Sequence, residues 1–146
     1  MSKYTPKKQS VPHSAQLSGS DSIPEYKDFI TWFEIPANNF DRACKFYSFI
    51  YQFKMETSEM NGLTMAFFPS STGIGGAIIS GTGSVPGDKG PLIYLNAGKD
   101  MDGMLQRIKE AGGSVLMEKT LINETAGHFA LFVDTEGNKL ALHAKP

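Results

Sequence analysis

The feature that most constrains this chain is an internal repeat with an offset of about 62 residues. At that offset, residues of the same kind coincide in a strand-like segment and again in a helix-like segment. The matching pairs are Ile30 with Leu92, Trp32 with Tyr94, Glu34 with Asn96, Ile35 with Ala97, Ala43 with Leu105, and Phe46 with Ile108. Later pairs stand 64 or 65 residues apart, as small loop differences would produce: Gly62 with Gly127, Phe67 with Phe132, and Gly73 with Gly137. Self-similarity at a nearly fixed spacing predicts one structural unit that is present twice.

Each half has the pattern of a strand, a helix and three further strands. Runs of β-branched and aromatic residues between turn residues indicate strands, and apolar residues at three- and four-residue spacing indicate helices. In the first half the segments are a strand over 29–36, a helix over 40–50 capped by Asn38 or Asn39, and strands over 52–58, 63–69 and 75–80. In the second half they are a strand over 91–97, a helix over 100–111 ended by Gly112 and Gly113, and strands over 114–122, 127–134 and 138–144. The sequence therefore predicts an α+β fold built from two tandem βαβββ modules.

The length of 146 residues is sufficient for one hydrophobic core. Residues 1–26, which include His13, are rich in Ser, Lys, Pro and Gln and show no periodicity, so we expect a flexible N-terminal tail. The remainder is expected to form a single domain over 27–146, with module one over 27–82, a linker over 83–90 and module two over 91–146.

Composition indicates which partners and which cellular compartment to expect. The net charge of -1 gives no electrostatic reason to expect nucleic acid or an anionic membrane as a partner. Cys44 is the single cysteine, so an intrachain disulfide is excluded, and its place on an apolar helix face favours a core role over a nucleophilic one. No apolar run is long enough to span a bilayer, and no apolar segment follows the basic N-terminus. We therefore expect a cytoplasmic protein that uses no membrane.

Three strings of sequence resemble those of a known superfamily. They are ITWFEIPANNFDRACKFY in the first half, and AGGSV followed by FVDTEGNKLALH in the second half. Their order and separation over residues 27–144 resemble the vicinal oxygen chelate superfamily, which includes glyoxalase I, extradiol dioxygenases and bleomycin-resistance proteins. The wording of the first string is most similar to a predicted glyoxalase-related branch. The resemblance implies curled mixed sheets that face a shared cup, and a homodimer, because members often complete their cups by pairing or exchanging halves.

In the metal-using members, the ligands are His, Gln or Glu side chains on the first and last strands of each half. The resemblance carries these positions to Ile30, Leu92, Ala141 and, with an open register, Ala77 or Ile79. None of these side chains can coordinate a divalent cation, which needs an imidazole, carboxylate or thiolate ligand. We therefore expect no metal, and the glycine-rich segments do not open a helix after a strand as a nucleotide cofactor would require.

Alternation along the strands predicts which side chains would line the cup. The candidate ligand-binding residues are Trp32 and Tyr94 as aromatic walls, and Glu34, Asn96 and His143 as hydrogen-bonding groups. An apolar pocket with a few convergent polar groups is typical of a small-molecule site. The alternatives are that the aromatic residues serve the core or a dimer interface, that Glu34 is solvated at a strand end, and that His143 frays near the C-terminus.

Three functions are compatible with such a cup. The first is metal-independent binding of a small molecule, which the absence of metal ligands and the aromatic walls favour. The second is a lyase or isomerase related to glyoxalase, with Glu34 as the general base and His143 as its partner. The third is an interaction module whose cup is filled by its own side chains. The sequence names no ligand or substrate.

Overall fold

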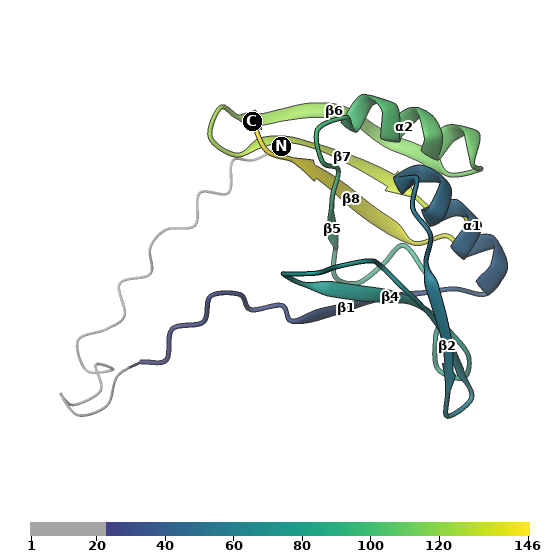
Figure 1. Ribbon diagram of the computed structural model, residues 1–146. Coiled ribbons are helices and arrows are strands. Elements are labelled where there is room, and N and C mark those ends of the chain that lie inside the picture. The colour runs from purple at the N-terminus through teal and green to yellow at the C-terminus, as the bar shows by residue number, and fades with distance from the viewer. Residues whose placement is uncertain (1–22) are drawn as a thin grey trace.

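The computed structural model describes residues 23–146, which form two βαβββ modules in succession (Figure 1). The first module contains β1 (Trp32–Pro36), α1 (Phe40–Tyr51), β2 (Glu56–Met60), β3 (Leu63–Phe67) and β4 (Gly75–Ser80). The second contains β5 (Tyr94–Asn96), α2 (Met101–Glu110), β6 (Ser114–Asn123), β7 (Gly127–Val133) and β8 (Lys139–Ala144). The α+β fold predicted from the repeat is confirmed. Residues 1–22 of the predicted tail, with His13, lie outside the described residues, and the predicted domain and linker limits stay predictions.

Each module forms one four-stranded mixed sheet, and neither sheet is closed. The strand orders are β1-β4-β3-β2 and β5-β8-β7-β6. In both sheets the first strand lies parallel to the last strand, and the other pairs are antiparallel. Two parallel strands need a long crossover between them, and this crossover contains the helix of the module. Because paired residues on neighbouring strands share a face, the pairings define a helix-facing side and an opposite side of each sheet. We call the opposite side the cup face.

The two helices begin where short polar side chains cap them. Asn39 is the N-cap of α1, and its side chain accepts a hydrogen bond from the backbone N–H of Arg42 at 3.0 Å. Asp100 caps α2 in the same way through the N–H of Gly103. The apolar stripe of each helix is buried, as the three- and four-residue spacing predicts. The buried residues are Ala43, Phe46, Tyr47 and Ile50 in α1, and Met101, Met104, Leu105 and Ile108 in α2.

The helix-facing sides of both sheets share one hydrophobic core with both helices. The two helices pack against each other (Figure 1). Phe46 of α1 also stacks on Phe132 of β7, with ring centroids 6.3 Å apart and an interplanar angle of 28°. Helix α1 therefore packs on the sheet of the second module as well as on its own. Burial of each large apolar side chain contributes roughly 1.5–3 kcal/mol, so this shared core joins the modules.

A polar turn adds a second connection between the modules. We call residues 134–138, between β7 and β8, the docking turn. The Tyr47 hydroxyl of α1 donates to Asp134 Oδ2 at 2.7 Å, and Asn138 Nδ2 donates to the Pro36 carbonyl at 2.8 Å. Arg42 Nε lies 2.7 Å from Glu136 Oε2 in an ion pair. The buried side chains of Asp134, Glu136 and Asn138 thus have hydrogen-bond partners, as the low dielectric of a protein interior requires.

Three predicted strands are too long or misplaced. Strand β1 begins at Trp32 and not at Phe29, because its neighbour β4 begins at Gly75, which pairs with Trp32. Phe29 and Ile30 thus have no paired strand, and they are 90% and 58% exposed. Strand β5 is limited to three residues. Strand β2 starts at Glu56, later than predicted, because α1 continues to Tyr51 before the chain turns. None of the helices in residues 23–146 is both long and apolar enough to cross a membrane.

Candidate functional site

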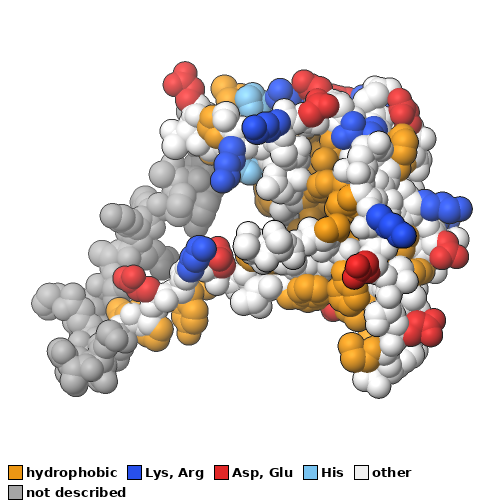
Figure 2. Space-filling view, viewed as in Figure 1, with side chains coloured by type: hydrophobic (Ala, Val, Ile, Leu, Met, Phe, Trp, Pro, Cys, Tyr) orange, Lys and Arg blue, Asp and Glu red, His pale blue; other side chains and the backbone are white. Residues whose placement is uncertain are grey.

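The cup face of the first sheet is partly aromatic and partly acidic. Glu34 on β1 pairs with Ala77 on β4, Ala77 pairs with Phe67 on β3, and Phe67 pairs with Glu56 on β2. These four residues therefore form one row across the sheet and point to the same side. Figure 2 shows hydrophobic side chains gathered over this part of the molecule. The buried part of this face is a separate small cluster of Met65, Ala77 and Ile79, with Leu63 and Phe67 packed against it.

Trp32 packs closely against β4 on this face because β4 has a glycine opposite it. A Cβ atom at Gly75 would lie 3.2 Å from Cζ3 of Trp32, which is tighter than ordinary contact. The indole ring also lies beside the Phe67 ring, with centroids 6.1 Å apart. Trp32 remains 44% exposed. The pair thus presents an aromatic surface to solvent, next to the row that contains Glu34.

The cup face of the second sheet combines apolar and neutral polar side chains. Tyr94 pairs with Ala141 and Asn96 with His143, so all four residues lie on the same side. Ala141 is fully buried beneath its neighbours, whereas Tyr94 is 54% exposed. The aromatic walls predicted from the repeat are therefore both accessible, one on each sheet.

Two of the predicted polar groups are engaged in local hydrogen bonds. His143 Nε2 lies 2.6 Å from the Ala126 carbonyl oxygen, so the ring is held against the β6–β7 turn. The Asn96 side chain accepts a hydrogen bond from the Gly98 N–H at 2.8 Å. Glu34, in contrast, is exposed and belongs to none of the ion pairs formed within residues 23–146. Among the five candidates, Trp32 and Glu34 come together on one face, and Tyr94, Asn96 and His143 on the other.

A small hollow of about 250 Å³ lies where the end of β1 meets the start of β8. Glu34 and Lys139 line it from the two cup faces, and Val85 and Lys89 line it from the connecting segment. The sequence places Lys139 on the cup side but assigns it no role. The spacing along the strand could have indicated such a role, because Lys139 precedes Ala141 by two residues and therefore lies on the same face.

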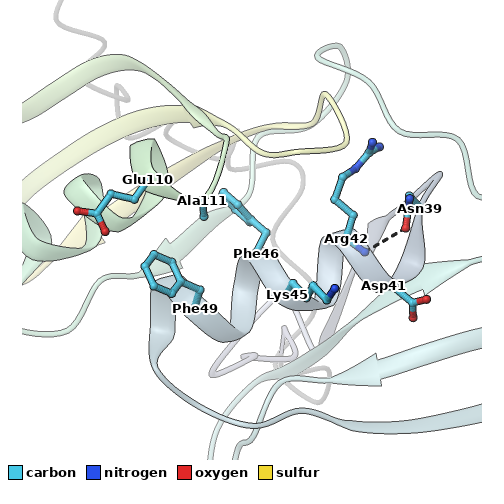
Figure 3. Close-up of a pocket in the computed structure, with 8 residues that line it drawn as sticks. All are labelled: Asn39, Asp41, Arg42, Lys45, Phe46, Phe49, Glu110 and Ala111. Carbon is cyan, nitrogen blue, oxygen red and sulfur yellow. Dashed lines mark hydrogen bonds between the residues drawn. The ribbon is translucent and has the colours of Figure 1, made fainter.

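A larger groove of about 570 Å³ lies on the helix side of the molecule, between α1 and the end of α2 (Figure 3). Arg42 and Lys45 stand toward one end of it, and Phe49 faces Glu110 and Ala111 at the other (Figure 3). No pattern in the sequence predicts this groove. Arg42 forms an ion pair with Glu136 of the second module, so its charge is already neutralised by a partner within the chain.

The shifted pKa values occur in the core and at the docking turn. Burial, reinforced by the neighbouring Asp134, raises the pKa of the Tyr47 hydroxyl well above its usual value. Burial also raises the pKa of the half-buried Cys44 thiol to about 11, so this thiol is a poor nucleophile at neutral pH. Burial raises the pKa of Glu136, but the hydrogen bonds from Arg42, Asn39 and Thr135 and the charge of Arg42 lower it by more. The net pKa of Glu136 is therefore below its usual value.

The strand pairings locate the positions that the resemblance assigns to metal ligands. Trp32 pairs with Gly75 as its repeat mate Tyr94 pairs with Ala141, so Gly75 is the counterpart of Ala141. This pairing corrects the register that the sequence left open between Ala77 and Ile79. The four positions then carry Ile30, Leu92, Gly75 and Ala141, and none supplies a donor atom. Among residues 23–146, His, Cys, Asp and Glu form no group of three that could hold a metal ion.

Two βαβββ modules with open, partly aromatic sheet faces define a class of α+β proteins with unclosed curled sheets. The comparison with protein families shows which superfamily of this class the chain matches. Residues 29–142 match the Glyoxalase/Bleomycin resistance protein/Dioxygenase superfamily. The chain therefore belongs to this superfamily, as its sequence strings indicate.

Individual relatives are distant. A glyoxylase-like domain-containing protein from Didymella fabae is 26% identical over 122 residues, which cover 80% of this chain and 94% of the relative. The antibiotic binding protein TnmS3 from Streptomyces sp. CB03234 has a TM-score of 0.56 and 20% identity, over 82% of this chain and 97% of that one. Glyoxalase I from Zea mays has a TM-score of 0.58 and 19% identity, over 77% of this chain and 43% of that one. At these identities the solved structures show a shared fold.

Proposed function

We propose that this protein binds an apolar small molecule in the cup between its two sheet faces, without a metal ion. The observation that carries this proposal is the surface formed by the exposed Trp32 and the half-buried Phe67 beside Glu34, on a face whose metal-ligand positions hold no donor atoms. Exposed aromatic side chains with a few polar neighbours suit an apolar ligand, because burying such a surface is favourable. The likeness to TnmS3, an antibiotic binding protein, supports a binding role.

We propose further that a homodimer closes the cup. Trp32 and Tyr94 are 44% and 54% exposed, so one chain leaves both aromatic walls open. A second copy could cover these faces by placing its own cup face against them. The chain covers 43% of maize glyoxalase I, so that protein is long enough to contain two such units in one chain. Sedimentation equilibrium should give twice the mass of the monomer of 15.9 kDa, and a monomer at all concentrations would contradict the dimer.

Titration with Nile red, a neutral apolar dye, tests the binding site. We expect saturable binding that Trp32→Ala and Phe67→Ser each weaken about tenfold or more, because a buried aromatic contact contributes at least about 1.4 kcal/mol. Phe49→Ala is the matched control, since Phe49 is an exposed aromatic residue in the helix-side groove. Loss of binding in Phe49→Ala alone would place the site in that groove and contradict the cup.

Elemental analysis of the purified protein tests the absence of a metal. We expect no stoichiometric Zn, Ni, Mn or Fe, because the positions that would bind the ion carry hydrocarbon or no side chain. Near-unit occupancy by any of these ions would contradict the proposal.

A glyoxalase-related lyase or isomerase is the second candidate. The exposure of the Glu34 carboxylate on the cup face favours it, because a general base must reach its substrate. In that case Glu34→Gln should abolish turnover and leave the melting temperature nearly unchanged. Equal loss of activity and stability would assign Glu34 a structural role.

A further inference from the structure

We infer that the ligand of the cup is an aromatic or apolar cation, held over Trp32 and Phe67 with Glu34 and Glu56 at its sides. The inference rests on the proposed binding function and adds the charge of the ligand. It follows from the distribution of charged residues over the two sheets and from the geometry of one row of the first sheet.

The two sheets differ in charge. The four strands of the first sheet contain three carboxylates, Glu34, Glu56 and Glu59, and no Lys, Arg or His. The strands of the second sheet contain two lysines and two histidines, and one carboxylate, Glu118. A ligand that lies on the first sheet therefore meets negative charge from that sheet.

The row across the first sheet places two carboxylates around an aromatic surface. Glu34 and Glu56 are its ends, and Ala77 and Phe67 lie between them. Neighbouring strands are about 4.8 Å apart, so the ends of this row are separated by about 14 Å, the width of a small planar molecule with its substituents. Neither carboxylate belongs to any of the ion pairs formed within residues 23–146. Both are free to meet an external cation.

The aromatic pair favours the same charge. A cation over the face of an indole ring is attracted by the ring quadrupole, and tryptophan is the strongest side chain in this respect. Trp32 lies against Gly75 and beside Phe67 and is 44% exposed, so part of its indole ring is open to a ligand. Carboxylates and ring faces thus act together on a positive group, whereas an anion would be repelled by both.

Two lysines lie beside Glu34, at one end of the acidic row. Lys89 and Lys139 line the small hollow together with Glu34, but neither forms an ion pair with it. They lower the negative potential at that end of the row, whereas Glu56 lies at the other end. Removal of the Lys139 charge should therefore strengthen the binding of a cation.

Three benzyl probes of similar shape and different charge test the inference: benzylammonium, benzyl alcohol and phenylacetate. Trp32 is the single tryptophan of the chain, so its fluorescence reports binding at this surface directly. We expect the cation to bind at least about fivefold more tightly than the neutral probe, because a charge pair in a solvated site contributes roughly 1 kcal/mol. Phenylacetate should bind most weakly.

Charge-neutralising variants locate the effect. Glu34→Gln and Glu56→Gln should each reduce the preference for the cation, the double variant should reduce it more than either single variant, and Lys139→Gln should increase it. Glu59→Gln is the matched control, because Glu59 lies on the same strand as Glu56 but pairs with Thr64 on the opposite face. It should leave the preference unchanged.

The possible failures are distinguishable. Equal or tighter binding of the neutral or anionic probe would overturn the cationic ligand and leave the binding function intact. The same loss of preference in Glu59→Gln as in Glu34→Gln would also overturn it, because the effect would then be that of net charge. If none of the probes changes the fluorescence of Trp32 or binds by calorimetry, and Nile red also fails to bind, the proposed function and this inference are both contradicted.

Discussion

The docking turn of the second module differs sharply from the matching turn of the first. By the repeat, residues 134–138 correspond to residues 70–74, and both turns contain a glycine of positive φ at the same place, Gly73 at 106° and Gly137 at 86°. In the docking turn Asp134, Glu136 and Asn138 are 4–8% exposed and hydrogen-bonded to the first module. The side chains at 70–72 are exposed and form no hydrogen bonds within the described residues.

The difference shows that two turns with a similar backbone conformation can make different side-chain contacts. Both turns reverse the chain between two antiparallel strands, and the glycine provides the left-handed conformation in each. In one copy, acidic and amide side chains reach the other module; in the other copy, Ser, Ser and Thr remain in solvent. Since a buried polar group is costly when unpaired, the docking turn is stable only as a complete set of hydrogen bonds.

Removal of the central carboxylate should have the largest effect. Asp134 accepts hydrogen bonds from the Tyr47 hydroxyl, the Asn138 side chain and the backbone N–H groups of Glu136 and Asn138. Asp134→Ala leaves these donors unpaired in a buried place, and we expect a loss of about 3–5 kcal/mol in the free energy of unfolding. Urea denaturation at neutral pH measures this loss.

Ser70→Ala is the matched control in the first module, because Ser70 is the repeat counterpart of Asp134. An exposed serine without a partner should change the unfolding free energy by less than about 0.5 kcal/mol. Equal effects of the two variants would show that the turns are equivalent and would contradict the comparison.

A smaller effect on stability is expected at a position where the two sheets pair side chains of different size. Phe33 pairs with Gly76 in the first sheet, whereas Leu95 pairs with Leu142 at the matching place in the second. A Cβ atom at Gly76 would overlap the Phe33 ring. Gly76→Ala should therefore cost about 1–3 kcal/mol, as overpacking does. Calorimetry should show that the added variant Phe33→Leu recovers part of this loss, and a double variant less stable than Gly76→Ala would contradict the explanation.

The smallest effect should appear as a pH dependence of the docking turn. Because the pKa of Glu136 is lowered in the folded protein, its ionised form contributes stability at neutral pH. This contribution is lost as the pH falls from the usual glutamate value through the lowered value of Glu136. The gap in unfolding free energy between the wild type and Glu136→Gln should thus shrink at acid pH. It should be modest, since the Arg42 side chain is 52% exposed. A constant gap between neutral and acid urea titrations would contradict the role of this ion pair.

Local patterns are sufficient to predict the elements of this fold. The strand periods, the apolar stripes of the two helices and the Asn39 cap each depend on neighbouring residues, and the structure confirms them. The sequence also shows that the metal-ligand positions of the resemblance carry no donor atom, because Ile30, Leu92, Ala141 and either Ala77 or Ile79 have hydrocarbon side chains. Strand limits were less predictable: the run from Phe29 to Pro36 is rich in β-branched and aromatic residues throughout, and only pairing with β4 shows that the strand starts at Trp32.

The sequence by itself determined the duplicated order of strands and helices, since periodicity and turn residues act over a few positions. The tertiary structure alone decided that Tyr47 meets Asp134, 87 residues away, and that Glu34, Phe67 and Glu56 form one row. Such contacts depend on how sheets and helices pack in three dimensions. No local preference of the chain specifies that packing, because each segment would adopt the same secondary structure in several arrangements of the two modules.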